Sequence, residues 1–396
     1  MSDSAFLGAA SANAVAVAND DVTIISGGVA WGGWEEVSIS RGIETIPSSF
    51  NCRGTERYPG ATGDSTVDII PGSPCVIKIG ADTVITGYVD IADRRVTPDT
   101  HEVEVAGRSK LCDLVDCSGF LKKWQFTNLT LLNIATQICA QFGITASAPD
   151  GDSAALPTVS VIITETGYEM LEEMARYVGK LLYDDTAGNL VIAGLGTNTH
   201  SSGVVEGVNV QEMRGTINAS ERMTEIAAVY TDTAILTDGA GSTTISIVQN
   251  AQATDTNWPA RADGQPRYRP LLIISEQGSG QNNVVPRRIQ WEMARRIGRS
   301  QQVEVTVDTW RDSAGTLWAP NYLIPVSLPS MKMTATTWLI TNVTYIKDDR
   351  GTYARLLLMP PQAMAPMPQA PFLYSAALAA ASGDTTGAQP SPTTGN

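Results

Sequence analysis

The side chains that most often carry catalysis or bind metals are scarce in this sequence. Only two histidines occur among its 396 residues, His101 and His200, and they lie far apart. The chain contains none of the spacings HExxH, HxH or GxSxG, and it has no Walker loop. The sequence therefore predicts no catalytic residue, no cofactor-binding residue and no metal ligand, and we predict that the protein is not an enzyme.

Acidic side chains cluster at three places that deserve weighing against this prediction. Glu169, Glu172 and Glu173 could supply the carboxylate pair of a glycosidase. They fall instead at the start of a predicted helix, where the helix dipole favours negative charge, so capping and solvation are the favoured interpretation. Asp184-Asp185 and Asp348-Asp349 have the pattern of turn residues, with calcium ligation as the alternative.

The tryptophans and cysteines give further limits. The segment GGVAWGGW (Gly27–Trp34) is glycine-rich but lies between predicted strands, so it does not predict a phosphate loop. Trp31 and Trp34 fit either interface anchors or core packing. The five cysteines are an odd number without a CxxC pair, which favours reduced thiols in a protein made in the cytosol.

Composition excludes some partners and favours others. The chain has 27 basic and 41 acidic residues and a formal charge of −14, which argues against sequence-specific nucleic-acid binding through phosphate contacts. Such a charge still suits a wall past which DNA moves without sticking. Charged residues make up 17% of the chain, which favours an obligate oligomer with large interfaces, although the Ala/Thr/Gly-rich ends alone could produce this value. No run is long enough to span a membrane, and the N-terminus lacks the basic start of a signal peptide.

The elements around this chemistry are mostly short strands. Thr83–Tyr88 and His101–Ala106 alternate in polarity and flank a polar turn containing Pro98, which predicts a β-hairpin. Ser109 is the predicted N-cap of a short helical turn that follows. In that turn we expect an aspartate to pair with the nearby arginine and three apolar side chains to close the end of a small barrel. These residues are Arg108, Leu111, Leu114 and Val115.

Three longer helices are predicted by apolar residues at helical spacing. The first is Leu129–Phe142, with Asn128 as N-cap and Gly143 as its end, and the second is Gly167–Val178, followed by a hairpin that turns through 184–189. The third runs from Pro286 to about Arg299. Its apolar face contains Ile289, Met293, Ala294 and Ile297, and Trp291 lies off that face as a second contact. Its five arginines suit a solvated face or, alternatively, a salt-bridging surface against a neighbouring subunit.

Together these elements predict an α+β fold that is predominantly β. It would have two similar antiparallel β-barrel domains with an inserted small α/β domain. The expected boundaries are an N-terminal arm at 1–20, a first barrel at 21–118, the α/β insert at 119–205, a second barrel at 206–235 and 300–360, an insertion with loops and a helix at 236–299, and a C-terminal tail rich in Pro, Ala, Gly and Thr at 361–396.

The two strand-rich regions also contain a weak internal repeat. Runs ending near ITGYVD and ITNVTYIKDD are each followed by a turn and an apolar strand, HEVEVAG in one region and TYARLLLM in the other. The repeat predicts a duplicated barrel; chance similarity between two hairpins is the alternative.

Four of these segments resemble a known family. TGYVD (Thr86–Asp90), VEVAGRSKLCDLVDCS (Val103–Ser118), RRIQWEMARRIGRSQQVEVTV (Arg287–Val307) and GTLWAPN (Gly315–Asn321) are similar to segments of the phage Mu-type baseplate hub family, the gpP-like proteins. That family is related to the base of type VI secretion spikes. The resemblance covers roughly Val22 to Met359 and neither terminus.

The resemblance implies a structural role in the tail baseplate of a virion, with a contractile tail. Three copies would form a pseudo-sixfold ring that joins the hexameric tail tube to the trimeric central spike and lets DNA pass. The implied partners are two further copies of the chain, the tail tube protein and the central spike protein, with the tape measure protein and other baseplate proteins as additional candidates.

Two alternatives remain open from the sequence. The predicted insert also resembles LysM-like modules, which implies a peptidoglycan-binding or peptidoglycan-degrading tail protein as one rival. The other is the hub of a tailocin or type VI-like injection device.

Overall fold

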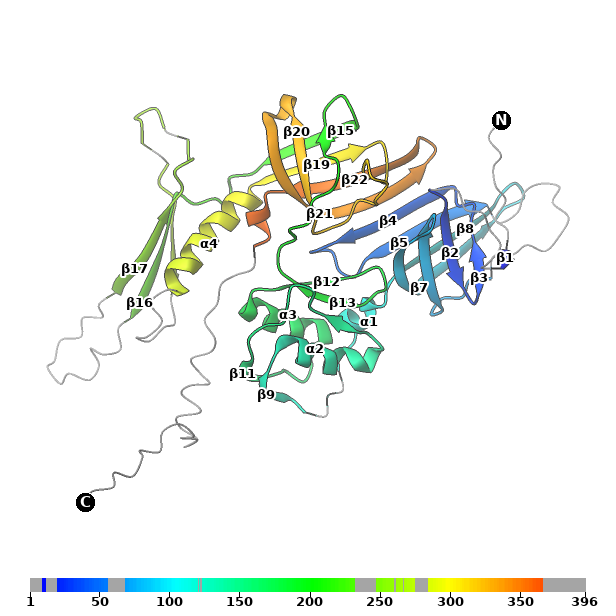
Figure 1. Ribbon diagram of the computed structural model, residues 1–396, viewed down its shortest axis with the longest axis horizontal. Helices are drawn as coiled ribbons and strands as arrows, with labels where there is room; N and C mark the ends of the chain where they lie inside the picture. Colours follow the sequence, from blue (N-terminus) through cyan, green and yellow to red (C-terminus); the bar gives the residue numbers. More distant parts are fainter. Residues whose placement is uncertain are drawn as a thin grey trace, which may run out of the picture.

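The computed structural model describes residues 9–11, 20–55, 68–119, 121, 123–231, 247–259, 261–265, 267–274 and 284–365. One large β-sheet dominates the molecule, and a small helical module packs beside it. A separate three-stranded sheet, β17-β16-β18, packs with one long helix at the opposite end of the molecule from the N-terminal strands (Figure 1). The expected fold class, predominantly β with antiparallel sheets and few helices, is confirmed.

The large sheet is a continuous path of mostly antiparallel strands. In order across the sheet these are β1 (Ala9–Ser11), β3 (Val29–Trp31), β2 (Val22–Ser26), β6 (Pro74–Ile79), β7 (Asp82–Val96), β8 (His101–Ser109), β5 (Ser49–Thr55), β4 (Glu36–Gly42), β21 (Met333–Asp348), β22 (Gly351–Met359), β19 (Gln301–Val307) and β15 (Val210–Ile217). Off this path, β20 (Leu323–Leu328) pairs with β21 and with β14 (Val204–Val205). The two strand-rich regions thus meet edge to edge at β4 and β21, and no pairing among the described residues closes either region into a separate barrel.

Strand alternation explains why the two regions also share one hydrophobic core. In β2, β6 and β8, every second side chain is buried, as expected for strands with one face on a core. Ile39 of β4 and Tyr345 of β21 pair directly and both are fully buried. Trp31 and Trp34 are buried in the same core, so core packing, and not interface anchoring, is the correct interpretation for both.

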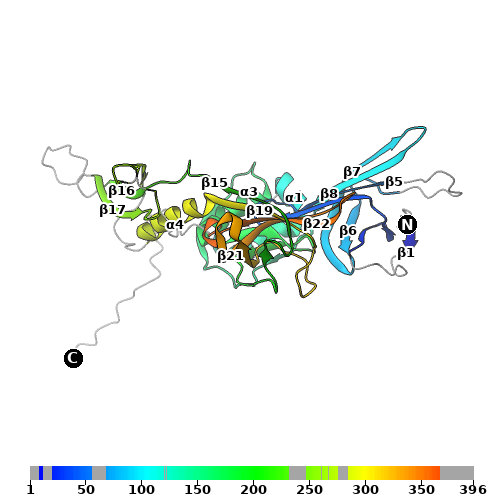
Figure 2. The ribbon, with the colours of Figure 1, turned by 90° about the horizontal axis from the view of Figure 1, so that it is seen from above.

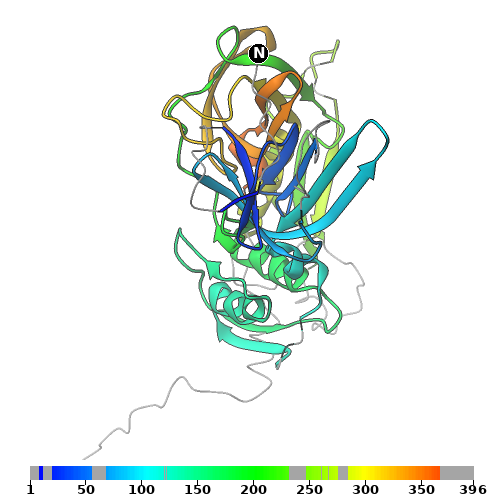
Figure 3. The same cartoon turned by 90° about the vertical axis from the view of Figure 1, so that its right-hand side faces the viewer.

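The first hairpin is longer than its sequence pattern predicted. β7 continues through the polar residues to Val96, and the turn is confined to 97–100. Figure 2 shows the β7–β8 hairpin projecting from the body, and Figure 3 shows it leaning away from the sheet. The short helix α1 (Leu111–Asp116) follows as expected, but its N-cap is Lys110 and not Ser109, because Ser109 is still part of β8.

The helical module between the two strand-rich regions has its own core. It contains α2 (Leu131–Cys139), α3 (Gly167–Val178), and the short strands β9 (Gln125–Leu129), β10 (Ala146–Ser147), β11 (Leu156–Ser160), β12 (Leu181–Asp184) and β13 (Leu190–Ala193), with the 3-10 turn η1 (Ala140–Phe142). Helix α3 and the β12–β13 hairpin match the sequence prediction, and Gly143 ends the first helical segment in a left-handed conformation. Thr130, not Asn128, caps α2, because Asn128 belongs to β9.

Leu111 and Leu114 of α1 belong to the core of this module. They were predicted to close the end of the first barrel, and that prediction is wrong. A helix that directly continues β8 carries its apolar side into the neighbouring module, which the local sequence pattern does not reveal.

The third unit is the small sheet β17–β16–β18 with helix α4 (Val284–Arg299) packed on it. Its strands are β16 (Glu225–Thr231), β17 (Ile247–Thr254) and β18 (Pro270–Ile274). Ile289 and Met293 of α4 are buried against Ile226 and Ala228, which confirms the predicted apolar face of this helix. The run at β16 was expected in the second barrel, but it pairs with β17 and β18 and not with the large sheet.

The predicted terminal segments are only partly described. Ala9–Ser11 of the expected N-terminal arm forms β1. The expected C-terminal tail begins with structure, since the turn η4 (Pro361–Ala363) packs against α4, and Ala363 and Met364 are buried. A further 3-10 turn, η3 (Pro329–Met331), follows β20. The remainder of both predicted ends lies outside the described residues. No helix in the described part of the chain has the length and apolarity to span a membrane.

Candidate functional site

The two histidines have separate environments. His101 lies on the β7–β8 hairpin, whereas the side chain of His200 is almost completely buried. The His200 Nδ1 atom lies 3.1 Å from Asp312 Oδ2, and its Nε2 accepts a 3.2 Å hydrogen bond from the Ala319 N–H. With Nε2 as acceptor, Nδ1 carries the proton that Asp312 accepts. The imidazole is therefore fully used in joining two loops.

The acidic clusters are likewise occupied by structural contacts. Glu169 closes a capping box with Thr166, in which each side chain bonds the other residue's backbone N–H. Glu172 pairs with Arg176 one turn later. Asp348 bonds Arg350 and Tyr353 at the tip of the β21–β22 hairpin, and these bonds lower its pKa to about 2.

Within the described residues, no group of three or more His, Cys, Asp or Glu side chains has an arrangement that could hold a metal ion. The five cysteines are free thiols, and all but Cys117 are buried. Burial raises the pKa of Cys75, Cys112 and Cys139 to about 12 each, so these thiols are poor nucleophiles at neutral pH.

The hairpin that the sequence marked out is fastened by one arginine, as predicted. Arg108 Nε donates to Asp90 at 2.7 Å, and its Nη2 lies 2.8 Å from Asp116 of α1. Asp90 is the bulged residue of β7, so this pairing connects the bulge, β8 and α1. Hydrogen bonds to the two aspartates raise the pKa of Arg108 further.

Two glycines let β7 and β8 approach closely at the same place. A Cβ on Gly107 would lie 2.1 Å from the Tyr88 carbonyl oxygen, and one on Gly87 would lie 1.9 Å from the Arg108 carbonyl oxygen. No side chain can occupy either position without moving the backbone. The glycines in TGYVD and VEVAGRSK are therefore steric requirements of this crossing.

Buried polar contacts join the helical module to both strand-rich regions. Asp184 was predicted to be a turn residue, but it is buried and accepts hydrogen bonds from the backbone N–H and the hydroxyl of Ser48, at 3.1 and 2.9 Å. On the other side, Asn321 accepts from the Gly196 N–H at 2.8 Å and donates to the Gly194 carbonyl at 3.1 Å. Because buried polar groups are costly to leave unpaired, these contacts fix the module in one orientation.

The GTLWAPN segment also joins the two strand-rich regions. Trp318 is fully buried in the shared core, and its backbone carbonyl accepts a hydrogen bond from Tyr345 Oη. Arg311, just before this segment, bonds the Gly315 carbonyl at 2.8 Å and Asp82 of the first region at 2.7 Å. The segment therefore has a structural explanation in the contacts that it makes.

A crevice of about 440 Å³ lies where α3, α4 and η4 meet. Here the arginines of α4 contact their own chain: Arg296 bonds Glu292 at 2.6 Å, Arg299 pairs with Glu44, and Arg295 stacks over Trp291. Trp291 in turn donates to the Ala365 carbonyl at 2.6 Å, which is the second contact expected of it. Arg288 belongs to the same helix, whereas the side chain of Arg287 lies outside the described residues. The predicted alternative of pairing with a neighbouring subunit has no support at Arg296 and Arg299.

Strand edges are the remaining candidates for a functional surface. β15 pairs with β19 alone among the described strands, and its side chains are mostly exposed. The outer half of β7, Ile91–Val96, pairs with β8 on one edge, and no described strand pairs with its other edge. Exposed strand edges readily accept another strand, so both edges are candidates for assembly contacts.

Comparison with known families fits this architecture. Residues 21–109 match the family "Mu phage baseplate assembly protein GpP-like, N-terminal", residues 111–194 match "Baseplate hub protein gp44-like, second domain", and residues 282–367 match "Mu phage baseplate assembly protein GpP, fourth domain". The chain is also 30% identical to the baseplate hub protein gp44 of Escherichia phage Mu over 347 residues. This alignment spans 86% of the chain and 88% of gp44.

The chain belongs to the Mu-type baseplate hub family. As a baseplate hub protein it is a structural component of a phage tail, which confirms the resemblance found in the sequence. The 43 kDa tail protein of prophage MuSo2 from Shewanella oneidensis has the same fold, with a TM-score of 0.73 and 30% identity over 89% of this chain and all of that one.

More distant structures share the fold of this hub protein. The tail protein from Neisseria meningitidis superposes with a TM-score of 0.68 and 17% identity, covering 88% of this chain and 99% of that chain. An E. coli component of the type VI secretion system has a TM-score of 0.51 and 10% identity, covering 85% and 76% of the two chains. The fold is therefore shared with a second tail protein and with a component of the type VI secretion system.

The contacts that sequence reasoning missed have no local signal. Ser48 and Asp184 are 136 positions apart, and His200 and Asp312 are 112 positions apart. Each looks ordinary in its own segment, and only the chain path brings the partners together. The open edges of β7 and β15 had one available signal, the internal repeat, which predicted that the two regions are copies.

Proposed function

We propose that three copies of this hub protein form a pseudo-sixfold ring that joins the hexameric tail tube to the trimeric central spike. The observation that carries this proposal is the repeat in the strand order. Across the sheet, the strands of the first region lie in the order β4-β5-β8-β7-β6, and those of the second lie in the order β15-β19-β22-β21-β20. When each set is numbered along the chain, the two spatial orders are the same. Three chains with two equivalent units each offer six similar positions to the tube, while the whole remains threefold for the spike.

In this arrangement the two strand-rich regions form the wall of the ring and the helical module, predicted at 119–205, lies outside the repeat. The proposal includes passage of DNA through the ring, since a chain of charge −14 repels phosphates and so disfavours binding during passage. We further propose that the protein works without catalysis, because His200 and the acidic side chains described above are engaged in structural contacts. It would be made in the host cytoplasm and function in the virion baseplate.

The oligomeric state is the first test. Size-exclusion chromatography with light scattering on the full chain, which has a mass of 42.1 kDa, should give a species of three chains. A protein that stays monomeric over the whole accessible concentration range would contradict the ring.

The partners and the rival functions need a second experiment. Purified tail tube protein and central spike protein, each mixed with the hub, should form complexes that co-elute, with threefold symmetry in electron micrographs of the assembled tail. Incubation with purified peptidoglycan should give neither pelleting of the protein nor release of soluble fragments. Release or pelleting would favour the peptidoglycan-directed alternative.

A further inference from the structure

The two copies of the repeat agree in detail as well as in strand order. In the first copy, the register between β7 and β8 shifts between Val89 and Ile91. In the second, the register between β21 and β22 shifts between Ile340 and Asn342. The partner on the other edge also has an irregularity at a matching point, within β6–β7 and within β20–β21. The bulges therefore align β7 with β21, with Val89 on Ile340 and Ile91 on Asn342.

This alignment extends through the sheet to β4 and β15. Ala92 and Val343 are each the second residue after the bulge, and they face Val105 and Leu356. Following the strand register across the next two strands leads to Val37 on β4 and to Met213 on β15. The chain of pairs is Val105↔Cys52↔Val37 in the first copy and Leu356↔Val305↔Met213 in the second. β15 is thus the counterpart of β4, residue by residue.

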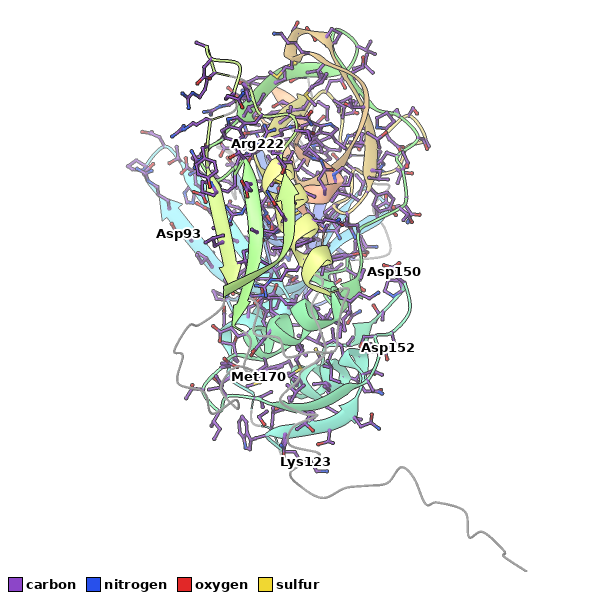
Figure 4. All side chains as sticks on the ribbon, turned by 90° about the vertical axis from the view of Figure 1, so that its left-hand side faces the viewer. Asp93, Lys123, Asp150, Asp152, Met170 and Arg222 are labelled. Atoms are coloured by element: carbon purple, nitrogen blue, oxygen red, sulfur yellow. The ribbon has the colours of Figure 1, made fainter. Side chains whose placement is uncertain are left out.

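Within the chain, these counterparts are paired only once. Asn342–Lys347 of β21 pairs antiparallel with 37–42 of β4, which forms the continuous core of the large sheet. The equivalent pair would be the outer half of β7 with β15, but these strands lie on opposite sides of the β4–β21 junction. Asp93, on that half of β7, lies far out on the projecting hairpin (Figure 4). The fold therefore contains one such junction, β4–β21, and the two strands, β7 and β15, that would form a second one.

We infer that β7 of one protomer pairs with β15 of the next, repeating between chains the β4–β21 junction within the chain. This inference rests on the proposed ring and identifies its inter-subunit contact. The register carried over from β4–β21 places Ala92 opposite Ile217, Arg95 opposite Arg214, and Val96 opposite Met213 of the adjacent copy.

The apolar side of this pairing accounts for exposed hydrophobic residues. Ile217 is 78% exposed and Val96 is 63% exposed, although each lies on a strand whose neighbours are core strands. Ala92 pairs with the buried Val105, and Met213 packs on the core, so the core-facing sides of both strands meet in the predicted register. Pairing would cover Ile217 and Val96. Between them it would place Arg94 opposite Gly215, which are the counterparts of the buried Tyr345 and Ile39.

The polar side is compatible with the same register. Arg95 and Arg214 would be directly opposed, but each already faces a glutamate on its own sheet, Glu102 and Glu304. Diagonal neighbours across an antiparallel pair are within reach of long side chains. In this register, those diagonals join Asp93 to Arg214 and Arg95 to Glu212. The register therefore combines one directly opposed pair of arginines with two diagonal pairs of opposite charge.

Disulfide trapping tests the register directly. The variant Ala92→Cys/Ile217→Cys, made in a Cys117→Ser background to remove the exposed native thiol, should form covalent dimers and trimers on oxidation. The matched control is Ala92→Cys/Arg214→Cys. Its offset of three residues separates the Cα atoms by about 10 Å, beyond disulfide reach. We expect about tenfold more linked protein from the first variant than from the control, with the 92–217 peptide identified by mass spectrometry.

Light scattering on the same samples separates this inference from the proposed ring. A trimer in which the 92–217 pair does not link, or links no better than the control, overturns the strand pairing and leaves the ring standing. A monomer overturns both.

Should the cysteine variants fold poorly, Ile217→Asp replaces them, because the side chain is exposed in the single chain. It should weaken trimer association at least about tenfold, since pairing would bury an unpaired charge. Val208→Asp, at a 76% exposed position outside β15, should leave association unchanged. Equal effects of the two substitutions would also overturn the pairing.

Discussion

The two copies of the repeated β unit have a bulge at the same position but stabilise it with different side chains. At the bulge of the first copy, two glycines allow the strands to cross closely, and Asp90 pairs with Arg108. At the bulge of the second, the corresponding residue is Thr341, whose hydroxyl donates to the Leu357 carbonyl at 3.1 Å. The position equivalent to Gly107 is the fully buried Leu358. Backbone register is shared, whereas the means of stabilising it is not.

This difference explains why the repeat is weak in the sequence. The similarity between ITGYVD and ITNVTYIKDD is displaced by several residues from the register that the bulges define. A duplicated unit can exchange a crossing stabilised by glycine and an ion pair for one stabilised by apolar packing, because each satisfies the same strand geometry. Substitutions that each remove one of these stabilising contacts can show how far the two copies are equivalent.

The largest expected effect comes from the glycine crossing of the first copy. Gly107→Ala should lower the free energy of unfolding by about 3 kcal/mol, because the new Cβ would clash with the Tyr88 carbonyl and with the ring of Phe50. Denaturant unfolding measures this loss. Gly119→Ala is the matched control, since the nearest atom to its Cβ lies at 3.7 Å. Similar stability of the two variants would show that the crossing relaxes easily and would weaken the contrast between copies.

The second copy relies on a buried acid where the first has a partly exposed one. Burial opposes ionisation of Asp312, but hydrogen bonds from Thr316, His200, Ser201 and Ala314 outweigh it and lower its pKa. A lowered pKa contributes stability above the ordinary aspartate range, and this stability is lost as the pH falls through the folded-state value.

Asp312→Asn should therefore cost about 2 kcal/mol at neutral pH, because it weakens a buried network of hydrogen bonds to a charged group. The difference from the unmodified protein should narrow as the pH falls below about 4, the usual aspartate range. Thermal unfolding of both proteins across this pH range is the measurement. A difference that stays constant with pH would mean that the charge of Asp312 contributes nothing to stability.

Loss of the arginine that fastens the first hairpin should have a smaller effect. Arg108→Ala should destabilise the protein by about 1 kcal/mol, because Arg108 and its partner Asp90 are each about one-third exposed and solvent screens their attraction. The effect should diminish in high salt, unlike that of Asp312→Asn. Arg53→Ala, which removes a more exposed pair with Glu36, is the control and should be nearly neutral. Equal losses from the two alanine variants would remove the special role of Arg108.

The smallest effect is expected at the proposed junction between chains. Asp93→Arg should weaken the trimer by about 0.5 kcal/mol through repulsion from Arg214 of the adjacent copy, and adding Arg214→Asp should restore it. Trimer dissociation followed by light scattering at low salt is the appropriate measurement. If the double variant assembles no better than the single one, the two side chains are not neighbours across the junction.

The sequence by itself determined the local elements. Alternating polarity specified the β7–β8 hairpin, helical spacing specified α3 and the apolar face of α4, and the Arg108 pairing lay within one short motif. Such features depend on residues that are close in sequence, so local pattern is enough to predict them. Family motifs, which are also local, identified the hub.

Only the tertiary structure decided how these elements combine. It joined the two strand-rich regions through β4 and β21, moved β16 into a separate sheet, and placed Leu111 and Leu114 in the core of the helical module. It also brought Ser48 to Asp184 and His200 to Asp312. These contacts depend on how strand edges pair and which buried polar groups find partners across long separations in sequence. That information is absent from any single segment and appears only when the whole chain is folded.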